Sequence, residues 1–591
     1  STKFTTGGGY LTTHSATNRV LLHFFTTFAV LHTTFNINMA NNNCLTALIE
    51  KSLKSHWDRE AFTDYKGATL LYRDVAERIA KLHILFEEAG IERGDRIALC
   101  GKNSSNWAVA CLAGISYGAV VVPILHEFKA DNVHNIVNHS EAKLFFVGEQ
   151  VWENLNESSM PAVEGIIVME GYQVVISRNE KISHAREHMN ELFGKKYPKD
   201  FSKDNVNYVE TFDEELAMIN YTSGSTGFSK GVMLPNRSII NNYMFGLHVI
   251  PHLKPGDVII SMLPMAHMYS FSFEFMYEFL KGCHVYFLTR LPSPKIIFQA
   301  FNELKPALIV AVPLVVEKII KKNVLPKLQT PSMKMLLKVP LVNDQIKKKI
   351  RDELITAFGG NLYEIIIGGA AFNQDVEKLL AEVKFPYTVG YGATECGPII
   401  SYEAWDKFKP GSCGKAALNM EVKVLSKDPE NIPGEIICRG PNVMLGYYKN
   451  DKLTEEAIDK DGWLYTGDLG IIDSEGNVFI KGRSKSLILG PSGQNIYPEE
   501  IEDHLNNMPY VSESLVISEG GKLVALVYPD FDETMKAKIT EEQIAVAMEQ
   551  NRVELNSMLP AYEQVSQIRI YHEEFEKTPK KSIKRFLYQK D

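Results

Sequence analysis

Hydrophobic residues recur along this chain at two spacings that alternate. Between Leu70 and Ala89 they fall at steps of three and four residues, which is typical of an amphipathic helix. A short apolar run follows at Arg96–Cys100, then a helical stretch at Trp107–Tyr117 and another apolar run at Ala119–Ile124. Buried strands that alternate with helices indicate a parallel sheet with helices on both faces.

The same alternation continues through most of the chain. Further strand candidates are Lys143–Val147, Val258–Leu263, Ala307–Val312 and Tyr363–Ile367. We therefore predict an α/β fold whose large N-terminal body, residues 39–482, holds several subdomains built mostly on parallel sheets.

The pattern changes after Lys481. Residues Gly482–Ser486 form a short polar connector, and beyond it lie strand candidates at Leu515–Ser518 and Leu523–Tyr528 and a helix from about Glu541. These features predict a second, smaller α+β domain at residues 483–591.

Composition narrows the class of protein. With 591 residues, the chain is too long for one hydrophobic core, so more than one domain is expected. The net charge of -9 argues against a nucleic-acid binder, although a local basic patch stays open. Seven dispersed cysteines without a C-x-x-C pair predict reduced thiols instead of disulfides or a structural metal.

The first 38 residues differ from the rest of the chain. Arg19 precedes an apolar run at Val20–Leu31, which is the outline of a signal or transit segment. The alternative is that Met39 is the natural start and that residues 1–38 are a disordered or non-native leader. We favour the second interpretation and leave these residues out of the fold. No later stretch has the continuous apolar length that a spanning helix requires.

The segment Tyr221–Gly231, Y-T-S-G-S-T-G-F-S-K-G, has the composition of a phosphate-binding loop. Glycines let the backbone approach an anion, hydroxyls add donors and a lysine supplies charge. It is not a Walker A loop, because two residues separate Gly227 from Lys230. A surface turn is the alternative. The candidate ligands of a phosphate are Thr222, Ser223, Gly224, Ser225, Thr226, Gly227 and Lys230.

Three more motifs follow in order: Gly368-Gly-Ala-Ala371, Tyr391-Gly-Ala-Thr-Glu395 and Tyr465-Thr-Gly-Asp468. With them, the chain resembles the adenylate-forming (AMP-binding) superfamily of acyl-CoA synthetases, luciferases and peptide-synthetase adenylation domains. The resemblance runs from about residue 45 to the C-terminus. It implies ATP, Mg²⁺ and coenzyme A as the cofactor, metal and co-substrate.

The resemblance also implies roles for single residues. Small residues after a strand let a flat base pack on the backbone, and Mg²⁺ prefers one or two carboxylates plus water. Tyr391 would stack on the adenine, which would lie against Gly369, Ala370 and Ala371, with Gly392 beside them. Thr394 would contact the α-phosphate, and Glu395 would hold Mg²⁺. Asp468 would accept hydrogen bonds from the ribose hydroxyls, and Arg483 would add a second ribose or phosphate contact.

His267, within Pro264–Tyr269, resembles the family's gate beside the acyl carboxylate, although a lone histidine is often a core residue. The aromatic residues that follow could line an acyl tunnel or belong to the core: Phe271, Phe273, Phe275, Tyr277 and Phe279.

Two half-reactions follow from the resemblance: a carboxylate attacks the α-phosphate of ATP, and the thiol of coenzyme A then displaces AMP. The small domain is expected to be mobile and to swivel at Lys485, bringing the loop around Gly493 to the thiol tunnel. Related enzymes carry a catalytic lysine near the C-terminus, but Ser582 occupies that register here. Lys581 is our preferred substitute, with Lys580 and Lys584 as neighbours.

The predicted substrate is a long-chain fatty acid, because Pro264–Tyr269, Gly368–Phe372 and Gly390–Tyr402 look most like bacterial long-chain acyl-CoA synthetases. The rivals are an acyl-AMP ligase that loads a carrier protein and a non-catalytic acyl- or nucleotide-binding relative. Lysines in residues 317–350 form either a contact with an anionic membrane or a solvated face. We expect a cytoplasmic protein, at the inner membrane face if that contact forms, and leave a homodimer open.

Overall fold

The computed structural model describes residues 44–223, 229–289, 294–323, 340–490, 494–578 and 582–589. Several sequence-based predictions lie outside these residues: the leader 1–38, the loop residues Gly224, Ser225, Thr226 and Gly227, part of the lysine-rich segment, Gly493 and Lys581.

The first large sheet has eight strands in the order β20-β9-β8-β4-β3-β5-β6-β7. Its centre is parallel and both ends are antiparallel. The strands are β3 (Arg96–Cys100), β4 (Val120–Ile124), β5 (Ala142–Val147), β6 (Gly165–Val168), β7 (Gln173–Ser177), β8 (Leu216–Ser223), β9 (Ser229–Pro235) and β20 (Gly446–Tyr447). The strand predictions in this region are confirmed.

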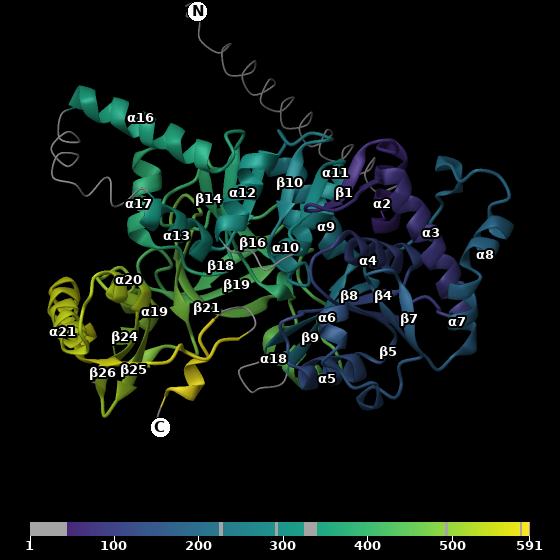
Figure 1. The fold of residues 1–591 in the computed structure, drawn as a ribbon. Helices are drawn as coiled ribbons and strands as arrows, with labels where there is room; N and C mark the ends of the chain where they lie inside the picture. The colour runs from purple at the N-terminus through teal and green to yellow at the C-terminus, as the bar shows by residue number, and fades with distance from the viewer. Residues whose placement is uncertain are drawn as a thin grey trace, which may run out of the picture.

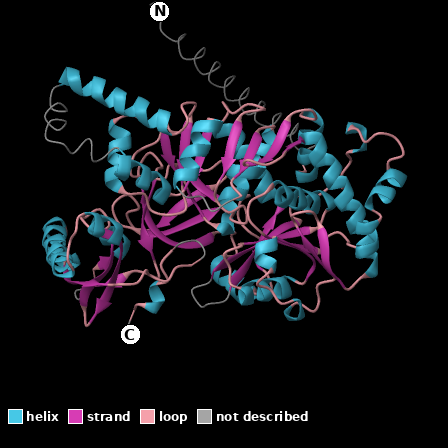
Figure 2. Ribbon diagram, in the orientation of Figure 1, coloured by secondary structure: helices cyan, strands magenta, loops and turns pink. Residues whose placement is uncertain are grey.

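The second large sheet has seven strands in the order β14-β13-β12-β10-β11-β1-β2 and is parallel except for the β1–β2 pair. The strands are β1 (Glu60–Asp64), β2 (Thr69–Leu71), β10 (Val258–Ser261), β11 (His284–Phe287), β12 (Leu308–Ala311), β13 (Glu364–Ile367) and β14 (Tyr387–Val389). Figure 2 shows the strands of this sheet among helices, as the alternating pattern predicts.

Helices pack between the two sheets, and one hydrophobic cluster includes residues of both. The amphipathic helix α3 (Tyr72–Ala89) ends at Gly90, whose φ of 74° is the left-handed conformation that glycine adopts without strain. Helix α4 (Ser105–Tyr117) contacts β3 and β4 of one sheet and β1 of the other, so almost all of it is buried. The other principal helices are α2 (Leu45–Ser55), α5 (Ala130–Ser140), α9 (Asn236–Val249), α12 (Pro294–Leu304) and α17 (Gln374–Glu382).

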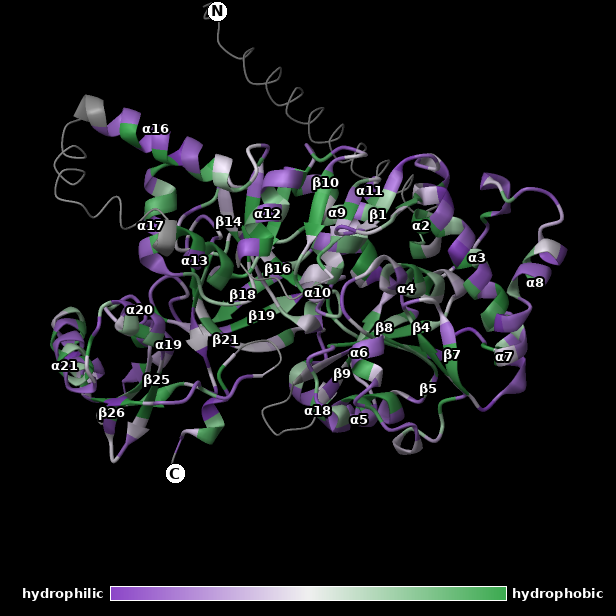
Figure 3. Ribbon diagram, viewed as in Figure 1, coloured by the Kyte–Doolittle hydropathy of each residue, from purple (hydrophilic) through white to green (hydrophobic). Residues whose placement is uncertain are grey.

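The lysine-rich segment is described in two parts, α13 (Pro313–Asn323) and α16 (Pro340–Ala357). Figure 1 shows α16 projecting from the body, and Figure 3 shows that hydrophilic and hydrophobic residues alternate along this helix, unlike the strands of the core. Among the described residues, no helix combines the length and apolarity needed to cross a membrane.

A third, antiparallel sheet was not predicted from the sequence. It consists of β18 (Glu421–Leu425), β19 (Gly434–Arg439), β21 (Leu464–Ile472) and β22 (Val478–Arg483), beside a small sheet of β15 (Tyr391–Gly392), β16 (Ile399–Tyr402) and β17 (Lys415–Ala416). Strand β22 continues through Arg483, so the polar connector that the sequence predicts at Gly482–Ser486 begins at Ser484 in the structure.

The chain beyond the connector forms an α+β unit with its own hydrophobic core, as predicted. The elements are β23 (Ile488–Leu489), β24 (Asn495–Ile496), α19 (Pro498–Leu505), β25 (Val511–Glu519), β26 (Lys522–Pro529), α20 (Phe531–Lys536), α21 (Glu541–Met558) and β27 (Val565–Ile570). Its core includes Ile501, Val516, Ala525 and Leu555. Figure 1 shows this unit, in yellow, beside the body.

Candidate functional site

One cavity, with a volume of about 2000 Å³, gathers the predicted site residues from distant parts of the chain. They are Thr222, Lys230, His267, Gly369, Ala370, Ala371, Tyr391, Gly392, Thr394, Glu395, Asp468, Arg483 and Lys485. Ser223 ends β8 next to this cavity wall, paired with Ser229. Every described residue of the predicted site therefore lies in or directly beside one cavity. The roles suggested for them stay predictions.

The described phosphate-loop candidates, Thr222, Ser223 and Lys230, lie on two adjacent antiparallel strands. Strands β8 and β9 are paired through Thr222 opposite Lys230 and on to Ser223 opposite Ser229. Burial lowers the pKa of Lys230, and the nearby Lys485 ammonium lowers it further, while the carboxylates of Glu395 and Glu456 act in the opposite direction. Two ammonium groups that repel each other inside a cavity favour an anionic ligand between them.

Glycines after β13 and β14 let the backbone line the cavity closely. Gly369 has a φ of 88°, which favours glycine. At Gly392 a Cβ atom would lie 2.2 Å from the carbonyl oxygen of Pro398, so no other residue fits this backbone approach. These segments bring several glycines and alanines to the cavity lining beside Tyr391, and such small residues suit the packing of a flat ring.

Asp468 lies at the centre of a small polar cluster. Tyr391 Oη donates to Asp468 Oδ2 at 2.7 Å, and Arg483 Nε lies 3.1 Å from Asp468 Oδ1. The Arg483 contact follows from the register of β21 and β22, which places the two residues opposite each other. Burial raises the pKa of Asp468, and Arg483 and Tyr391 partly offset this rise. The carboxylate is suited to accept hydrogen bonds from hydroxyl groups.

Glu395 lies in the short 3₁₀ turn Thr394–Cys396. Tyr447 Oη donates to Glu395 Oε1 at 2.9 Å. In the ranges that the structure describes, no group of three His, Cys, Asp or Glu side chains could hold a metal ion by itself. Glu395 nevertheless fits Mg²⁺, because this ion usually takes one or two protein carboxylates and completes its shell with phosphate and water. Tyr447 was not predicted, since no local pattern distinguishes it.

Two buried side chains hold the segment that carries His267 to the cavity. Asn103 Oδ1 accepts from the Met265 amide at 2.9 Å, and Asn103 Nδ2 donates to the Leu263 carbonyl at 2.6 Å. Glu274 accepts from the Leu263 amide at 3.0 Å and from Ser270 Oγ at 2.5 Å. Burial raises the pKa of Glu274 to about 8. Sequence reasoning missed both residues because their partners are distant or lie on the backbone.

The aromatic residues after His267 divide between the core and the cavity, the two locations that the sequence left open. Phe271, Phe275, Tyr277 and Phe279 are fully buried in the core. Phe273 lines the cavity, where its ring contacts Phe245 at a centroid distance of 6.0 Å. Other apolar residues continue this side of the cavity: Ile250, Met262, Leu288, Val312, Leu314 and Ile366. The cavity thus combines a polar part with an apolar part.

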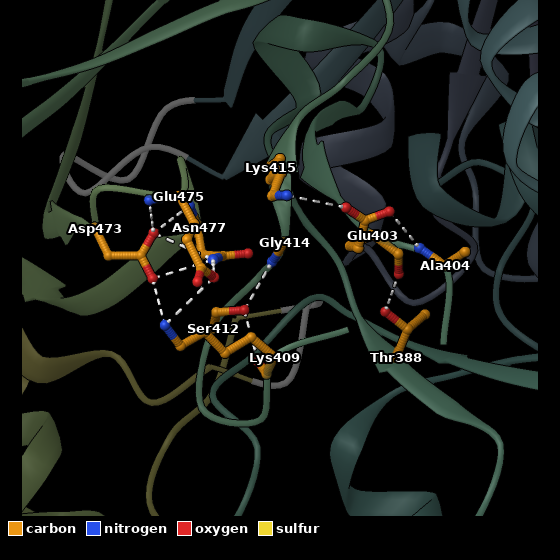
Figure 4. A network of polar contacts seen from close by, with 10 residues as sticks. All are labelled: Thr388, Glu403, Ala404, Lys409, Ser412, Gly414, Lys415, Asp473, Glu475 and Asn477. Atoms are coloured by element: carbon orange, nitrogen blue, oxygen red, sulfur yellow. Dashed lines mark hydrogen bonds and ion pairs between the residues drawn. The ribbon is translucent and has the colours of Figure 1, made fainter. Parts of the chain in front are cut away.

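A polar network braces the cavity wall at residues 410–413 (Figure 4). Lys409 Nζ lies 2.8 Å from Asp473 Oδ2, and the Asn477 amide group donates to the same carboxylate. Ser412 Oγ donates to the Lys409 carbonyl at 2.7 Å and so closes the loop on itself. The network fixes the β21–β22 turn, and with it the antiparallel sheet that carries Asp468, against the wall.

The C-terminal segment also reaches the cavity. Thr578, Ser582, Lys584 and Arg585 line it, and Lys577 forms a β-bridge with Ile583. The Thr578 amide donates to the Ser582 carbonyl at 2.8 Å, so the chain on both sides of Lys581 lies at the cavity. Arg585 contacts Glu502, and Lys584 contacts Glu576. These pairs tie the segment to the C-terminal unit.

Comparison with known proteins identifies relatives over nearly the whole chain. Residues 49–448 match the family model of the AMP-binding enzymes, and residues 485–591 match the AMP-binding enzyme C-terminal domain. Long-chain-fatty-acid–CoA ligase of Escherichia coli O157:H7 is 27% identical over 498 residues, which cover 81% of this chain and 83% of that protein.

A plant relative, 4-coumarate-CoA ligase 1 of Narcissus pseudonarcissus, is 24% identical over 485 residues, covering 79% of this chain and 80% of that protein. Among solved structures, ATP-bound MatB from Rhodopseudomonas palustris superposes with a TM-score of 0.72 at 21% identity, covering 93% of this chain and 98% of that one. At this identity the structural likeness establishes the fold.

Replacing Glu274 with glutamine should make stability less sensitive to alkaline pH. A carboxyl group with a raised pKa binds its proton more tightly in the folded protein, so the free energy of unfolding falls as pH rises from about 4.5 to about 8. Each pH unit in this window costs the wild type up to about 1.4 kcal/mol, a cost that glutamine avoids. Thermal midpoints of E274Q and wild type, measured between pH 5 and 9, should diverge in favour of the variant.

The matched control is E303Q, because Glu303 pairs with Lys66 on the surface, where ion pairs contribute little. A difference between E274Q and wild type that stays constant over this pH range would contradict the assignment.

Proposed function

This chain belongs to the AMP-binding enzyme family and is an adenylate-forming acid–CoA ligase, and we propose that the acid it activates is a long-chain fatty acid. The observation that carries the proposal is the single cavity in which cationic, acidic and apolar walls meet. Such a cavity can hold a nucleotide, its metal and an acyl chain together.

In the first half-reaction, an oxygen of the fatty acid carboxylate attacks the α-phosphorus of ATP, and pyrophosphate leaves. The protein contributes by positioning the reactants and by neutralising the negative charge of the phosphates. Tyr391 and Asp468 would hold the nucleoside, while Lys230 and Thr394 would contact the phosphates. Glu395 would hold Mg²⁺, which supplies further positive charge to the departing pyrophosphate.

In the second half-reaction, the coenzyme A thiol attacks the acyl carbonyl, and AMP leaves. We propose that the C-terminal domain, residues 483–591, swivels at Lys485 between the two steps and brings the loop at Gly493 to the thiol. Lys581 is the proposed cation for the first step. Its support is that Thr578 and Ser582, on either side of it, line the cavity.

The choice of a fatty acid rests on the apolar part of the cavity and on the E. coli relative. The likeness to a 4-coumarate ligase supports an aromatic acid as a second candidate substrate. An enzyme that loads a carrier protein would form no acyl-CoA, and a non-catalytic relative would release no pyrophosphate. Both therefore differ from the proposed ligase in a product that can be measured.

A pyrophosphate-release screen tests the substrate class. Wild-type protein is given MgATP with acids from acetate to oleate and with 4-coumarate, in the presence and absence of coenzyme A. We expect the highest kcat/KM with long-chain acids and acyl-CoA only when coenzyme A is present. Preference for 4-coumarate would reject the fatty acid. ATP binding without pyrophosphate release from any acid would favour a non-catalytic protein.

Truncating Phe245 should alter chain-length preference. Its ring is buried against Phe273 and Tyr402 at the apolar part of the cavity, so Phe245→Ala enlarges the space available to the acyl chain. Each additional buried methylene contributes about 0.8 kcal/mol. We expect kcat/KM for long acids relative to octanoate to rise about 10-fold, which corresponds to roughly 1.4 kcal/mol. Phe245→Trp should shift the ratio in the opposite direction. Unchanged ratios in both variants would mean that the acyl chain does not bind beside Phe245.

Restricting the hinge should separate the two half-reactions. Lys485 lies in the turn closed by the Ser486 amide and the Arg483 carbonyl, directly after β22. Proline fixes φ and would oppose rotation there. Lys485→Pro should slow thioester formation at least 10-fold more than adenylation, measured by acyl-CoA formation and by pyrophosphate exchange. Lys485→Ala controls for loss of the ammonium group. Equal loss in both assays would contradict a hinge.

A further inference from the structure

A short segment of the chain, Met444–Tyr448, connects the turn that carries Glu395 with the strand that carries Lys230. Three backbone hydrogen bonds make the connection: the Met444 amide to the Glu395 carbonyl at 2.9 Å, the Leu445 amide to the Met233 carbonyl at 2.9 Å and the Tyr448 amide to the Gly231 carbonyl at 2.8 Å. The two charged residues are distant in sequence, and this segment adds a second connection to the direct packing of the β9 strand against the Thr394–Cys396 turn.

The side chain of Tyr447 also connects Glu395 with Lys230, inside the cavity. Its hydroxyl donates to Glu395 Oε1 at 2.9 Å, and its ring lies 5.1 Å from the Lys230 ammonium. The residue is only 7% exposed. One ring thus contacts both an acidic and a basic group of the site.

The backbone at Tyr447 is held firmly. Thr454 Oγ1, in helix α18 (Asp451–Ala457), accepts from the Tyr447 amide at 2.9 Å. The preceding residue, Gly446, has a φ of 140°, and a Cβ atom there would lie 2.5 Å from Thr454 Cγ2. Only glycine lets the threonine approach so closely. The backbone from which the Tyr447 side chain extends is therefore fixed in position.

We propose that Tyr447 is a positioning residue that orients the Glu395 carboxylate toward the metal ion of bound MgATP. The hydroxyl occupies Oε1 and turns the other oxygen, Oε2, to the cation. Hydrogen bonds that orient metal ligands in this way commonly change metal affinity by about 10- to 100-fold. The inference rests on the proposed function for the identity of the ligand, but it concerns the binding of the metal–nucleotide complex and not the acid.

The test is Tyr447→Phe, which removes the hydroxyl and keeps the ring beside Lys230. Tyr448→Phe is the matched control, because Tyr448 Oη donates to Glu141 Oε2 at 3.1 Å and Tyr448 does not line the cavity. Calorimetry on the full chain gives the Kd of ATP with saturating Mg²⁺ and with EDTA. We expect Y447F to lose about 10-fold of the tightening that Mg²⁺ produces, with the Kd in EDTA unchanged. Y448F should match the wild type.

A double-mutant cycle with Glu395→Gln distinguishes orientation from general damage. If Tyr447 acts through Glu395, Y447F should have no further effect on the Mg²⁺-dependent tightening in the E395Q background. Each variant is compared with its own Kd in EDTA, so a shared loss of stability does not imitate the result. Full tightening by Mg²⁺ in Y447F, or the same loss in both backgrounds, would overturn the proposal.

The proposed function can fail separately. Wild-type protein that binds MgATP more tightly than ATP but releases no pyrophosphate with any acid would reject the ligase activity. In that case the Y447F comparison would still decide the role of Tyr447.

Discussion

The site depends on holding charges of both signs inside one partly enclosed cavity. Lys230 and Lys485 repel each other there, and the Glu395 carboxylate partly compensates. Asp468, also buried, is stabilised by Arg483 and Tyr391. Charges removed from water are costly unless they are paired or await a ligand of opposite charge. This balance favours a polyanion that arrives together with a cation, as a nucleotide with a divalent metal ion does.

Such a balance requires that charged groups carried by separate sheets keep fixed positions relative to one another. The scaffold achieves this with polar contacts to the backbone. Glu274 and Asn103 fix the segment before His267, and the Lys409–Asp473 contact braces the antiparallel sheet. Glu274 and Asn103 are buried, and there a hydrogen bond to the backbone is both directional and costly to lose. The backbone segments that carry the cavity residues are therefore held in place.

The apolar part of the cavity adjoins these charges directly. A fatty acid presents both chemistries at once, since its carboxylate must reach the phosphates while its chain needs a surface removed from water. Phe245, Phe273 and Ile250 offer that surface. The same cavity also receives the C-terminal segment from Thr578 to Arg585, so the two domains share one site.

Local patterns in the sequence determined the two parallel sheets, the α+β unit and the motif residues that the cavity gathers, because strand and helix periods and glycine-bearing loops are properties of neighbouring residues. Tertiary structure alone decided the antiparallel sheet at Glu421–Arg483, the core position of Phe271 and Phe275, and the contacts of Tyr447 and Glu274. These features arise from pairing between segments far apart in the chain. No short stretch encodes which carboxylate a tyrosine will meet 52 residues away.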